Sequence, residues 1–455
     1  MKSYQAELSA RIAEERAAVE LIKITSDLSF ERSIELTIFR NQLIDKRSSE
    51  ILNLHEYATK FVVKPINIFE TLSIANEIKK SSLSPSKIDI GKLTFEWINE
   101  KEKYNNITSF IIARLNFINK ECTNINPKDV ILYGFGRIGR LLARELMAQE
   151  GKGEQLRLRA IVLRKNDDQN IIKRASLLRT DSVHGKFPGT VVEDLENKAL
   201  VINGQSVKLI KASSPEDIDY TSYGIEKALV IDNTGVYRDK EALSKHLQAK
   251  GTSKVLLTAP GKGIPNIVFG ANHFEYGIDS HDIFSAASCT TNAITPILKI
   301  VSDELGIDKG HIETIHAYTN DQNLVDNMHK NERRGRAAAL NMVITTTGAG
   351  NAVVKVIPSL EGKLTANAVR VPTPNGSLAI LNLSIKSKTS IDEFNKIIKK
   401  AALKGPLVEQ INYSISRELV SSDIVGNNSA AIFDSPATIV SKDGKNIILY
   451  VHSRK

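Results

Sequence analysis

The chain has 455 residues, of which 42% are hydrophobic and 25% are charged, as is typical of a globular protein with a substantial core. Its two cysteines allow no disulfide framework and show no metal-ligand spacing, so we expect a reducing compartment, the cytoplasm, and no bound metal. The net charge of +9 favours small anionic ligands such as phosphates. No apolar run is long enough to span a bilayer, and neither a membrane nor a nucleic acid is the expected partner.

Residues 1–126 show helical periodicity without any ligand-binding motif. In the first segment, apolar residues recur on one helical face, at Leu8, Ile12, Val19 and Ile22. Further helices are predicted at 33–44, 50–63, 91–106 and 108–119, and a linker at 122–127. We therefore expect an all-α N-terminal extension, which is either a packing or oligomerisation appendage or a regulatory, partner-docking module.

The next segment has the order strand, glycine-rich loop and helix. The apolar run 130–133 leads into a G-x-G-x-x-G sequence, and helical spacing follows over 140–146. In this context the glycines let the backbone approach a pyrophosphate at the start of the helix. The predicted dinucleotide-binding residues are Gly134, Phe135, Gly136, Arg137, Ile138 and Gly139. With a second strand over 158–163, this pattern predicts a Rossmann domain at 127–288.

The residues after the second strand decide which dinucleotide binds. A carboxylate at Asp167 would hold the adenosine ribose and favour NAD. Arg164 or Lys165 could instead pair with the 2′-phosphate of NADP. A third interpretation treats these charges as a solvated turn. NAD is the cofactor expected, and NADP is the alternative.

Cys289 is predicted to lie at the N-terminus of a helix, because the apolar segment 292–301 follows it. The candidate caps of that helix are Thr290, Thr291 and Asn292. Unpaired N–H groups at a helix start favour a thiolate. His316 follows the β-prone run 312–315, and a Cys–His pair supplies an activated nucleophile and a general acid/base.

The chain from Cys289 onward mixes helices with strands, which are predicted at 311–317, 365–370, 378–385 and 446–451. An antiparallel sheet with helices on one face is the expected arrangement, so residues 289–455 form an α+β domain. Within the preceding domain, alternation over 199–211 predicts a hairpin that turns at Asn203-Gly204.

Together these motifs resemble phosphorylating glyceraldehyde-3-phosphate dehydrogenase, from about Lys128 to the C-terminus. The matching stretches are Gly134–Arg140, Asp181–Gly185, Ser288–Asn292, His316–Gln322 and Arg370–Asn375. The resemblance implies an α/β fold class, with a Rossmann domain and an α+β catalytic domain behind the all-α extension. It also implies a cytoplasmic homotetramer that acts in glycolysis and gluconeogenesis.

The same resemblance implies oxidative phosphorylation of glyceraldehyde 3-phosphate to 1,3-bisphosphoglycerate. Cys289 would form a thiohemiacetal and then a thioester, His316 would accept the hydroxyl proton, and inorganic phosphate would release the product. The residues implied for the substrate phosphate and its neighbouring hydroxyl are Thr319, Asp321 and Arg370. Those implied for the attacking phosphate are Ser288, Thr290, Arg334, Thr347 and Gly348. Those implied for the nicotinamide side are Thr234, Gly235 and Thr258.

The chain departs from the family pattern in several places. Tyr133 stands where the family usually has Asn, although Asp167 falls on the family's ribose-binding acid in a gapless count from Asp181. After 447–451 the family continues into a Trp-Tyr-Asp-Asn-Glu segment and a long helix, whereas this chain stops at Lys455, so we expect that helix to be absent.

Two other functions stay open at this point. Erythrose-4-phosphate dehydrogenases share much of the pattern, which makes erythrose 4-phosphate an alternative substrate. The missing C-terminal segment favours instead a catalytically impaired, nucleotide-binding relative that acts as an interaction protein through its N-terminal helices.

Overall fold

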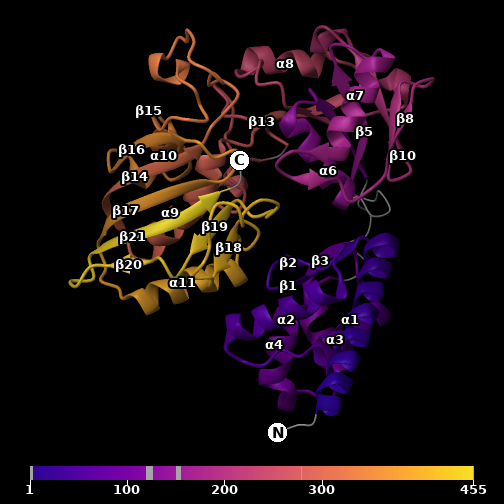
Figure 1. Cartoon of the computed structure of the whole chain (residues 1–455), viewed down its shortest axis with the longest axis vertical. Helices are drawn as coiled ribbons and strands as arrows, with labels where there is room; N and C mark the ends of the chain where they lie inside the picture. Colours follow the sequence, from indigo (N-terminus) through magenta and orange to yellow (C-terminus); the bar gives the residue numbers. More distant parts are fainter. Residues whose placement is uncertain (1–3, 119–126, 150–154, 278, 454–455) are drawn as a thin grey trace. The chain divides into compact units, whose positions relative to one another are not determined.

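The computed structural model describes residues 4–118, 127–149, 155–277 and 279–453, so most of the predicted linker at 122–127 lies outside the described residues. The chain forms two compact units, one of residues 1–130 with 141–159 and one of residues 131–140 with 160–455. The predicted α/β fold class is confirmed, because the described residues form two eight-stranded sheets together with helices. Figure 1 draws the strands as arrows and the helices as coiled ribbons. No helix in the described ranges is long and apolar enough to cross a membrane. The domain boundaries at residues 126 and 288 stay a prediction.

The N-terminal region is mainly helical but is not all-α as predicted. Its helices are α1 (Tyr4–Arg32), α2 (Ser48–Val62), α3 (Ile68–Lys80), α4 (Ile90–Glu100) and α5 (Ile107–Leu115). Its strands are β1 (Ile34–Ile38), β2 (Asn41–Gln42) and β3 (Ser86–Asp89), and they pair in the order β2-β1-β3. The helix predicted at 33–44 is therefore wrong. Ile34, Thr37 and Ile38 are β-branched and buried, and such residues favour a strand packed under helices.

Asp89 joins the end of β3 to the β1–β2 turn and to α4. Its carboxylate accepts the N–H groups of Phe39 and Arg40 at 2.9 Å each and that of Lys92 at 3.0 Å. Phe39 and Arg40 have φ angles of 42° and 73°, a left-handed conformation that is strained for residues other than glycine. Burial raises the pKa of Asp89, and the three N–H groups oppose that rise. The turn therefore depends on one partly buried carboxylate.

The dinucleotide-binding part contains an eight-stranded sheet in the order β13-β12-β11-β4-β5-β10-β9-β8. Its strands are β4 (Lys128–Tyr133), β5 (Leu156–Leu163), β8 (Val191–Asp194), β9 (Ala199–Ile202), β10 (Gln205–Lys211), β11 (Ala228–Asp232), β12 (Thr252–Leu257) and β13 (Ile283–Ser285). Its helices are α6 (Arg137–Gln149), α7 (Asp168–Arg179) and α8 (Lys240–Gln248), and β6 (Thr180–Asp181) pairs with β7 (Gly185–Lys186). The parallel pairs β5–β10, β11–β12 and β12–β13 fit a Rossmann domain. The predicted hairpin is confirmed, with Asn203 and Gly204 at positive φ between β9 and β10.

The C-terminal part contains a second sheet in the order β15-β16-β14-β17-β21-β19-β18, with β20 paired to β21. Its strands are β14 (Ile307–Ala317), β15 (Val343–Thr345), β16 (Leu364–Val371), β17 (Ser377–Ile385), β18 (Ile411–Ser414), β19 (Ala431–Asp434), β20 (Ile439–Val440) and β21 (Asn446–Ser453). Its helices are α9 (Cys289–Glu304), α10 (Ala349–Val356) and α11 (Ile391–Leu403). Helix α9 packs across β14, β17, β19 and β21, and it contacts α10 and α11. The sheet is mixed rather than purely antiparallel, because β14–β16 and β18–β19 are parallel.

We expect Asp89→Ala to destabilise the N-terminal unit by about 3 kcal/mol or more, because three backbone N–H groups lose their acceptor at roughly 1–3 kcal/mol each. Urea unfolding followed by the fluorescence of Trp97, the chain's one tryptophan, measures this change in the unit that carries Asp89. Asp89→Asn is the matched control, because it keeps one carbonyl oxygen and should lose less. An Asp89→Ala variant as stable as the wild type would show that the β1–β2 turn does not need this carboxylate.

Candidate active site

The helix that begins at Cys289 owes its start to Ser288. Ser288 has the extended backbone of an N-cap, and its side chain accepts the N–H of Thr291 at 3.0 Å. The cap predicted within 290–292 is therefore wrong, because the hydroxyl that reaches the third helical N–H belongs to the residue before the thiol. Cys289 is the first residue of α9, and its thiol is free and exposed.

His316, near the end of β14, lies beside this thiol. Its Nε2 is 3.6 Å from the Sγ of Cys289, and 8% of the residue is exposed. Its Nδ1 lies 2.7 Å from the carbonyl oxygen of Ala317 and 2.6 Å from Nη1 of Arg370. Arg370 is the register partner of His316 on β16. The structure thus brings the two predicted catalytic residues together and adds an arginine on the far side of the imidazole.

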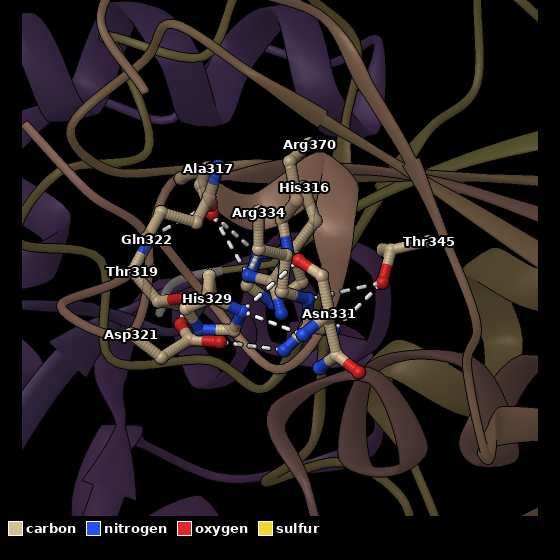
Figure 2. A network of polar contacts seen from close by, with 10 residues as sticks. All are labelled: His316, Ala317, Thr319, Asp321, Gln322, His329, Asn331, Arg334, Thr345 and Arg370. Atoms are coloured by element: carbon tan, nitrogen blue, oxygen red, sulfur yellow. Dashed lines mark hydrogen bonds and ion pairs between the residues drawn. The ribbon is translucent and has the colours of Figure 1, made fainter. Parts of the chain in front are cut away.

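Polar side chains form a network around this arginine (Figure 2). Arg334 donates from Nη1 to Asp321 at 2.5 Å and from Nη2 to Thr345 at 2.7 Å. The hydroxyl of Thr319 donates to the carboxylate of Asp321. Burial lowers the pKa of Arg370, and the nearby Asp321 opposes that shift. Residues expected at two different phosphates therefore share one network, and Thr345, which was not predicted, belongs to it.

The other residues expected at the attacking phosphate lie at two helix starts. Ser288 and Thr290 flank the thiol at the first turn of α9, where the hydroxyl of Ser288 is 2.6 Å from that of Thr291. Thr347 accepts the N–H of Ala349 at 3.2 Å, and Gly348 is the N-cap residue of α10. Unpaired N–H groups at a helix start suit phosphate oxygens, so both places are compatible with the expectation.

The glycine-rich loop between β4 and α6 has a backbone shape that a dinucleotide fits. Gly134 has a φ of 96°, and a Cβ on Gly139 would lie 2.4 Å from the carbonyl oxygen of Gly134. A Cβ on Gly136 would meet nothing within 4 Å, so the loop is open where a pyrophosphate would approach. The remaining predicted loop residues differ in exposure: Phe135 is buried, Arg137 is half-buried and Ile138 is exposed.

Asp167 does not stand free at the end of the second strand. β5 ends at Leu163, and Asp167 is the N-cap of α7, where it accepts from the backbone and side-chain nitrogens of Asn170 at 3.1 and 2.8 Å. The side-chain bond to Asn170 lowers the pKa of Asp167. Arg164 and Lys165 follow the strand directly and are exposed. Arg164 is therefore the first residue after β5, and the carboxylate of Asp167 comes three residues later.

A buried Asp–His pair supports the loop expected at the nicotinamide side, although sequence reasoning gave it no role. Asp232 accepts from the backbone N–H and the hydroxyl of Thr234 at 2.8 and 2.7 Å, and lies 2.9 Å from Nε2 of His246. Neither the Asp232 nor the His246 side chain is exposed. The rings of Tyr133 and Tyr237 meet the imidazole edge to face. Tyr133, which departs from the family pattern, is therefore accommodated by this pair.

The loop beyond Asp232 is also held from its other end. The backbone N–H and the hydroxyl of Thr258 both donate to the carbonyl oxygen of Asp232, at 3.1 and 3.0 Å. Gly235 has a φ of 68°, which suits a tight turn. Asn233 donates its N–H to the carbonyl of Tyr133 at 2.9 Å. Thr234, Gly235 and Thr258 therefore lie on segments that are tied to Asp232 and to the strand before the glycine-rich loop.

Comparison with known proteins agrees with this architecture. Residues 128–240 match the glyceraldehyde 3-phosphate dehydrogenase NAD binding domain, and residues 288–451 match the C-terminal domain of that enzyme. A "glyceraldehyde-3-phosphate dehydrogenase-like protein" of Pseudomonas aeruginosa is 46% identical over 436 residues, 95% of this chain and 94% of that protein. "Glyceraldehyde-3-phosphate dehydrogenase 2" of Trichormus variabilis is 41% identical over 312 residues, 68% of this chain and 89% of its own. The protein of the same name in Bacillus subtilis is 38% identical over 321 residues, 70% of this chain and 90% of its own.

The Rossmann sheet, the open glycine-rich loop and the matched NAD-binding domain define a dinucleotide-dependent oxidoreductase. The chain belongs to the glyceraldehyde-3-phosphate dehydrogenase family, and its cofactor is NAD. Because the Pseudomonas protein matches 436 of the 455 residues, most of the N-terminal extension is shared with that relative.

We expect His246→Leu to raise the dissociation constant for NAD about tenfold, because Asp232 loses the donor that orients it toward Thr234 and a factor of ten is roughly 1.4 kcal/mol. His246→Gln is the matched control, since its amide can still donate to Asp232 and should restore binding. Isothermal titration with NAD measures both variants. Wild-type NAD affinity in the leucine variant, together with a lower melting temperature, would reduce the pair to a purely structural role.

Proposed function

We propose that the chain is a phosphorylating glyceraldehyde-3-phosphate dehydrogenase, which converts glyceraldehyde 3-phosphate, NAD and inorganic phosphate into 1,3-bisphosphoglycerate and NADH. The observation that carries this proposal is the thiol of Cys289 at a helix start, 3.6 Å from Nε2 of His316. We place the reaction in the cytoplasm, within glycolysis and gluconeogenesis.

In the first half of the reaction, the Sγ of Cys289 attacks the aldehyde carbon, and the thiol proton passes through Nε2 of His316 to the carbonyl oxygen, which gives a thiohemiacetal. Nε2 of His316 then accepts the hydroxyl proton as the C–H bond breaks, which leaves a thioester on Cys289. NAD, when bound, supplies the carbon that takes up the hydride. In the second half, a phosphate oxygen attacks the thioester carbon, the C–S bond breaks, and Cys289 leaves as a thiolate.

The network of Figure 2 supports a phosphorylated substrate. We assign Arg370, Thr319 and Asp321 to the substrate phosphate and its neighbouring hydroxyl, because Arg370 contacts the imidazole of His316 and the other two follow the end of β14. Guanidinium groups bind phosphate oxygens through paired N–H donors, and hydroxyl groups add single bonds. The attacking phosphate is assigned to Arg334 and to the two helix starts, with the residues Ser288, Thr290, Thr347 and Gly348.

Erythrose 4-phosphate is the alternative substrate, because the same thiol and the same phosphate-binding groups would oxidise it. Its chain is one carbon longer, so the distance between the aldehyde and the phosphate separates the two substrates. Comparing kcat/KM for both aldehydes in one preparation decides between them.

We also propose that the chain assembles as a homotetramer. Six large apolar side chains between the network residues Asp321 and Thr345 are 60–92% exposed, namely Leu324, Val325, Met328, Leu340, Met342 and Ile344. Exposed apolar side chains concentrated in one segment are typical of a protein–protein contact. Sedimentation analysis should give four times the 50.2 kDa of one chain.

The thiol mechanism makes a direct prediction for Cys289 and His316. Cys289→Ser should abolish NADH formation, and His316→Asn should lower kcat by about 10²–10⁴-fold if the imidazole accepts a proton in the transition state. Cys122→Ser, which changes the chain's second cysteine, is the matched control and should keep wild-type activity. Turnover in the Cys289→Ser variant would rule out a covalent intermediate.

Cofactor choice depends on which residue after β5 meets the adenosine ribose, Arg164 or Asp167. If Arg164 meets the adenosine ribose, Arg164→Ala should lower kcat/KM for NADP about tenfold and leave that for NAD nearly unchanged, because a lost charged contact to a 2′-phosphate is worth about 1.4 kcal/mol. If Asp167 meets it, Asp167→Ala should weaken NAD and relax discrimination against NADP. Initial rates with both cofactors separate the two outcomes. A tenfold preference of the wild type for NADP would contradict NAD as the favoured cofactor.

A further inference from the structure

A cavity in the N-terminal unit takes no part in the reaction proposed above. It has a volume of about 360 Å³ and lies among residues of α1, of α2 and of the segment that leads into α3. Leu52, Ile66 and Ile68 line it and are buried, and the exposed Phe69 lines it as well. Pockets that bind small molecules are typically of this size and have apolar walls with a few polar groups.

One polar group of this cavity has an unused lone pair. His55 lines the cavity, only 5% of the residue is exposed, and its Nδ1 lies 2.7 Å from the carbonyl oxygen of Ile51. A carbonyl oxygen only accepts hydrogen bonds, so the ring proton resides on Nδ1 and Nε2 keeps a lone pair. That Nε2 is buried and has no hydrogen-bond partner among the described residues. Burial lowers the pKa of His55, which keeps the ring neutral near pH 7.

Two other polar side chains of the cavity serve the fold. The hydroxyl of Thr59 accepts the N–H of Ile66 at 3.0 Å, and the side chain of Asn67 caps α3 by accepting the N–H of Glu70 at 2.9 Å. These bonds fix the chain between α2 and α3, which forms one wall of the cavity. The imidazole of His55 is therefore the group that remains to receive a donor from a ligand.

The charges around the cavity favour a neutral ligand. Two basic and two acidic side chains line it, namely Arg11, Lys60, Glu14 and Glu56, and Nη1 of Arg11 lies 3.9 Å from Oε2 of Glu14. Because the four charges cancel, the cavity offers no net charge to an ion. A metal is not favoured at His55 either, since no group of three or more His, Cys, Asp or Glu side chains in the described ranges could hold one.

We propose that this cavity binds a small, neutral and mainly apolar molecule that donates one hydrogen bond, from a hydroxyl or an N–H group, to Nε2 of His55. The apolar body of the ligand lies against Leu52, Ile66 and Ile68. A buried acceptor without a donor is unfavourable, so a ligand that supplies the donor gains affinity. Because Nε2 is closed off from solvent, the ligand has to shift a side chain of the cavity wall to reach it. The site belongs to the N-terminal unit and does not depend on the proposed dehydrogenase reaction.

Indole and benzofuran are the probes that test this site, because the two fused-ring molecules have nearly the same shape and only indole carries an N–H group. Isothermal titration of the full chain should give a dissociation constant for indole about tenfold lower than that for benzofuran, as expected of one hydrogen bond to a buried acceptor. His55→Phe keeps a ring but removes the acceptor, and it should abolish this preference. His55→Gln keeps a carbonyl oxygen that can accept, and it should restore part of the preference.

His311→Phe is the matched control, because His311 is exposed and its two ring nitrogens have partners on β16, Thr365 and Asn367. This variant should prefer indole as the wild type does. Equal affinities of the wild type for indole and benzofuran, or no binding of either, would overturn the proposal, and a water molecule that satisfies Nε2 would give that result. A preference for indole that survives in His55→Phe would overturn it as well. The wild-type comparison decides the question even if His55→Phe does not fold.

Discussion

The parallel pairing of β14 with β16 is the constraint on which the site depends. It sets His316 opposite Arg370, and the same strand end carries the chain on to Thr319 and Asp321. A slip of one residue would turn His316 to the other face of the sheet and away from the thiol. The thiol itself is fixed separately, by the Ser288 cap at the start of α9. The site therefore forms where one strand register and one helix start meet.

Both arginines of the site make hydrogen bonds within the protein. Arg334 is held by Asp321 and Thr345, and Arg370 is held by an imidazole and a carbonyl. A buried donor without an acceptor would cost roughly 1–3 kcal/mol, so these partners stabilise the site. A ligand then has to exchange partners rather than fill a gap. Its binding is consequently coupled to rearrangement of the groups that perform the chemistry.

The sequence correctly predicted the features that depend on backbone preferences over a few residues. It did not predict the features that depend on tertiary contacts. The glycine-rich loop, the Asn203-Gly204 hairpin and the helix after Cys289 follow from backbone preferences over a few residues. The helix prediction for 33–44 was wrong, because local spacing does not show that this segment is buried under the N-terminal helices or that it pairs with β3. The sequence did not predict the roles of Thr345 and His246 for the same reason, because their partners Arg334 and Asp232 lie 11 and 14 residues away in sequence.

Gly136 and Gly139 belong to one motif, yet different constraints hold them. Gly139 faces the carbonyl of Gly134 and is required by the fold itself, whereas Gly136 faces open space and is required only by a ligand. A descendant of this chain that stopped binding a dinucleotide would therefore be free to change Gly136 long before Gly139. Gly139 therefore reflects a requirement of the fold, and Gly136 reflects a requirement of the ligand, although both belong to one motif.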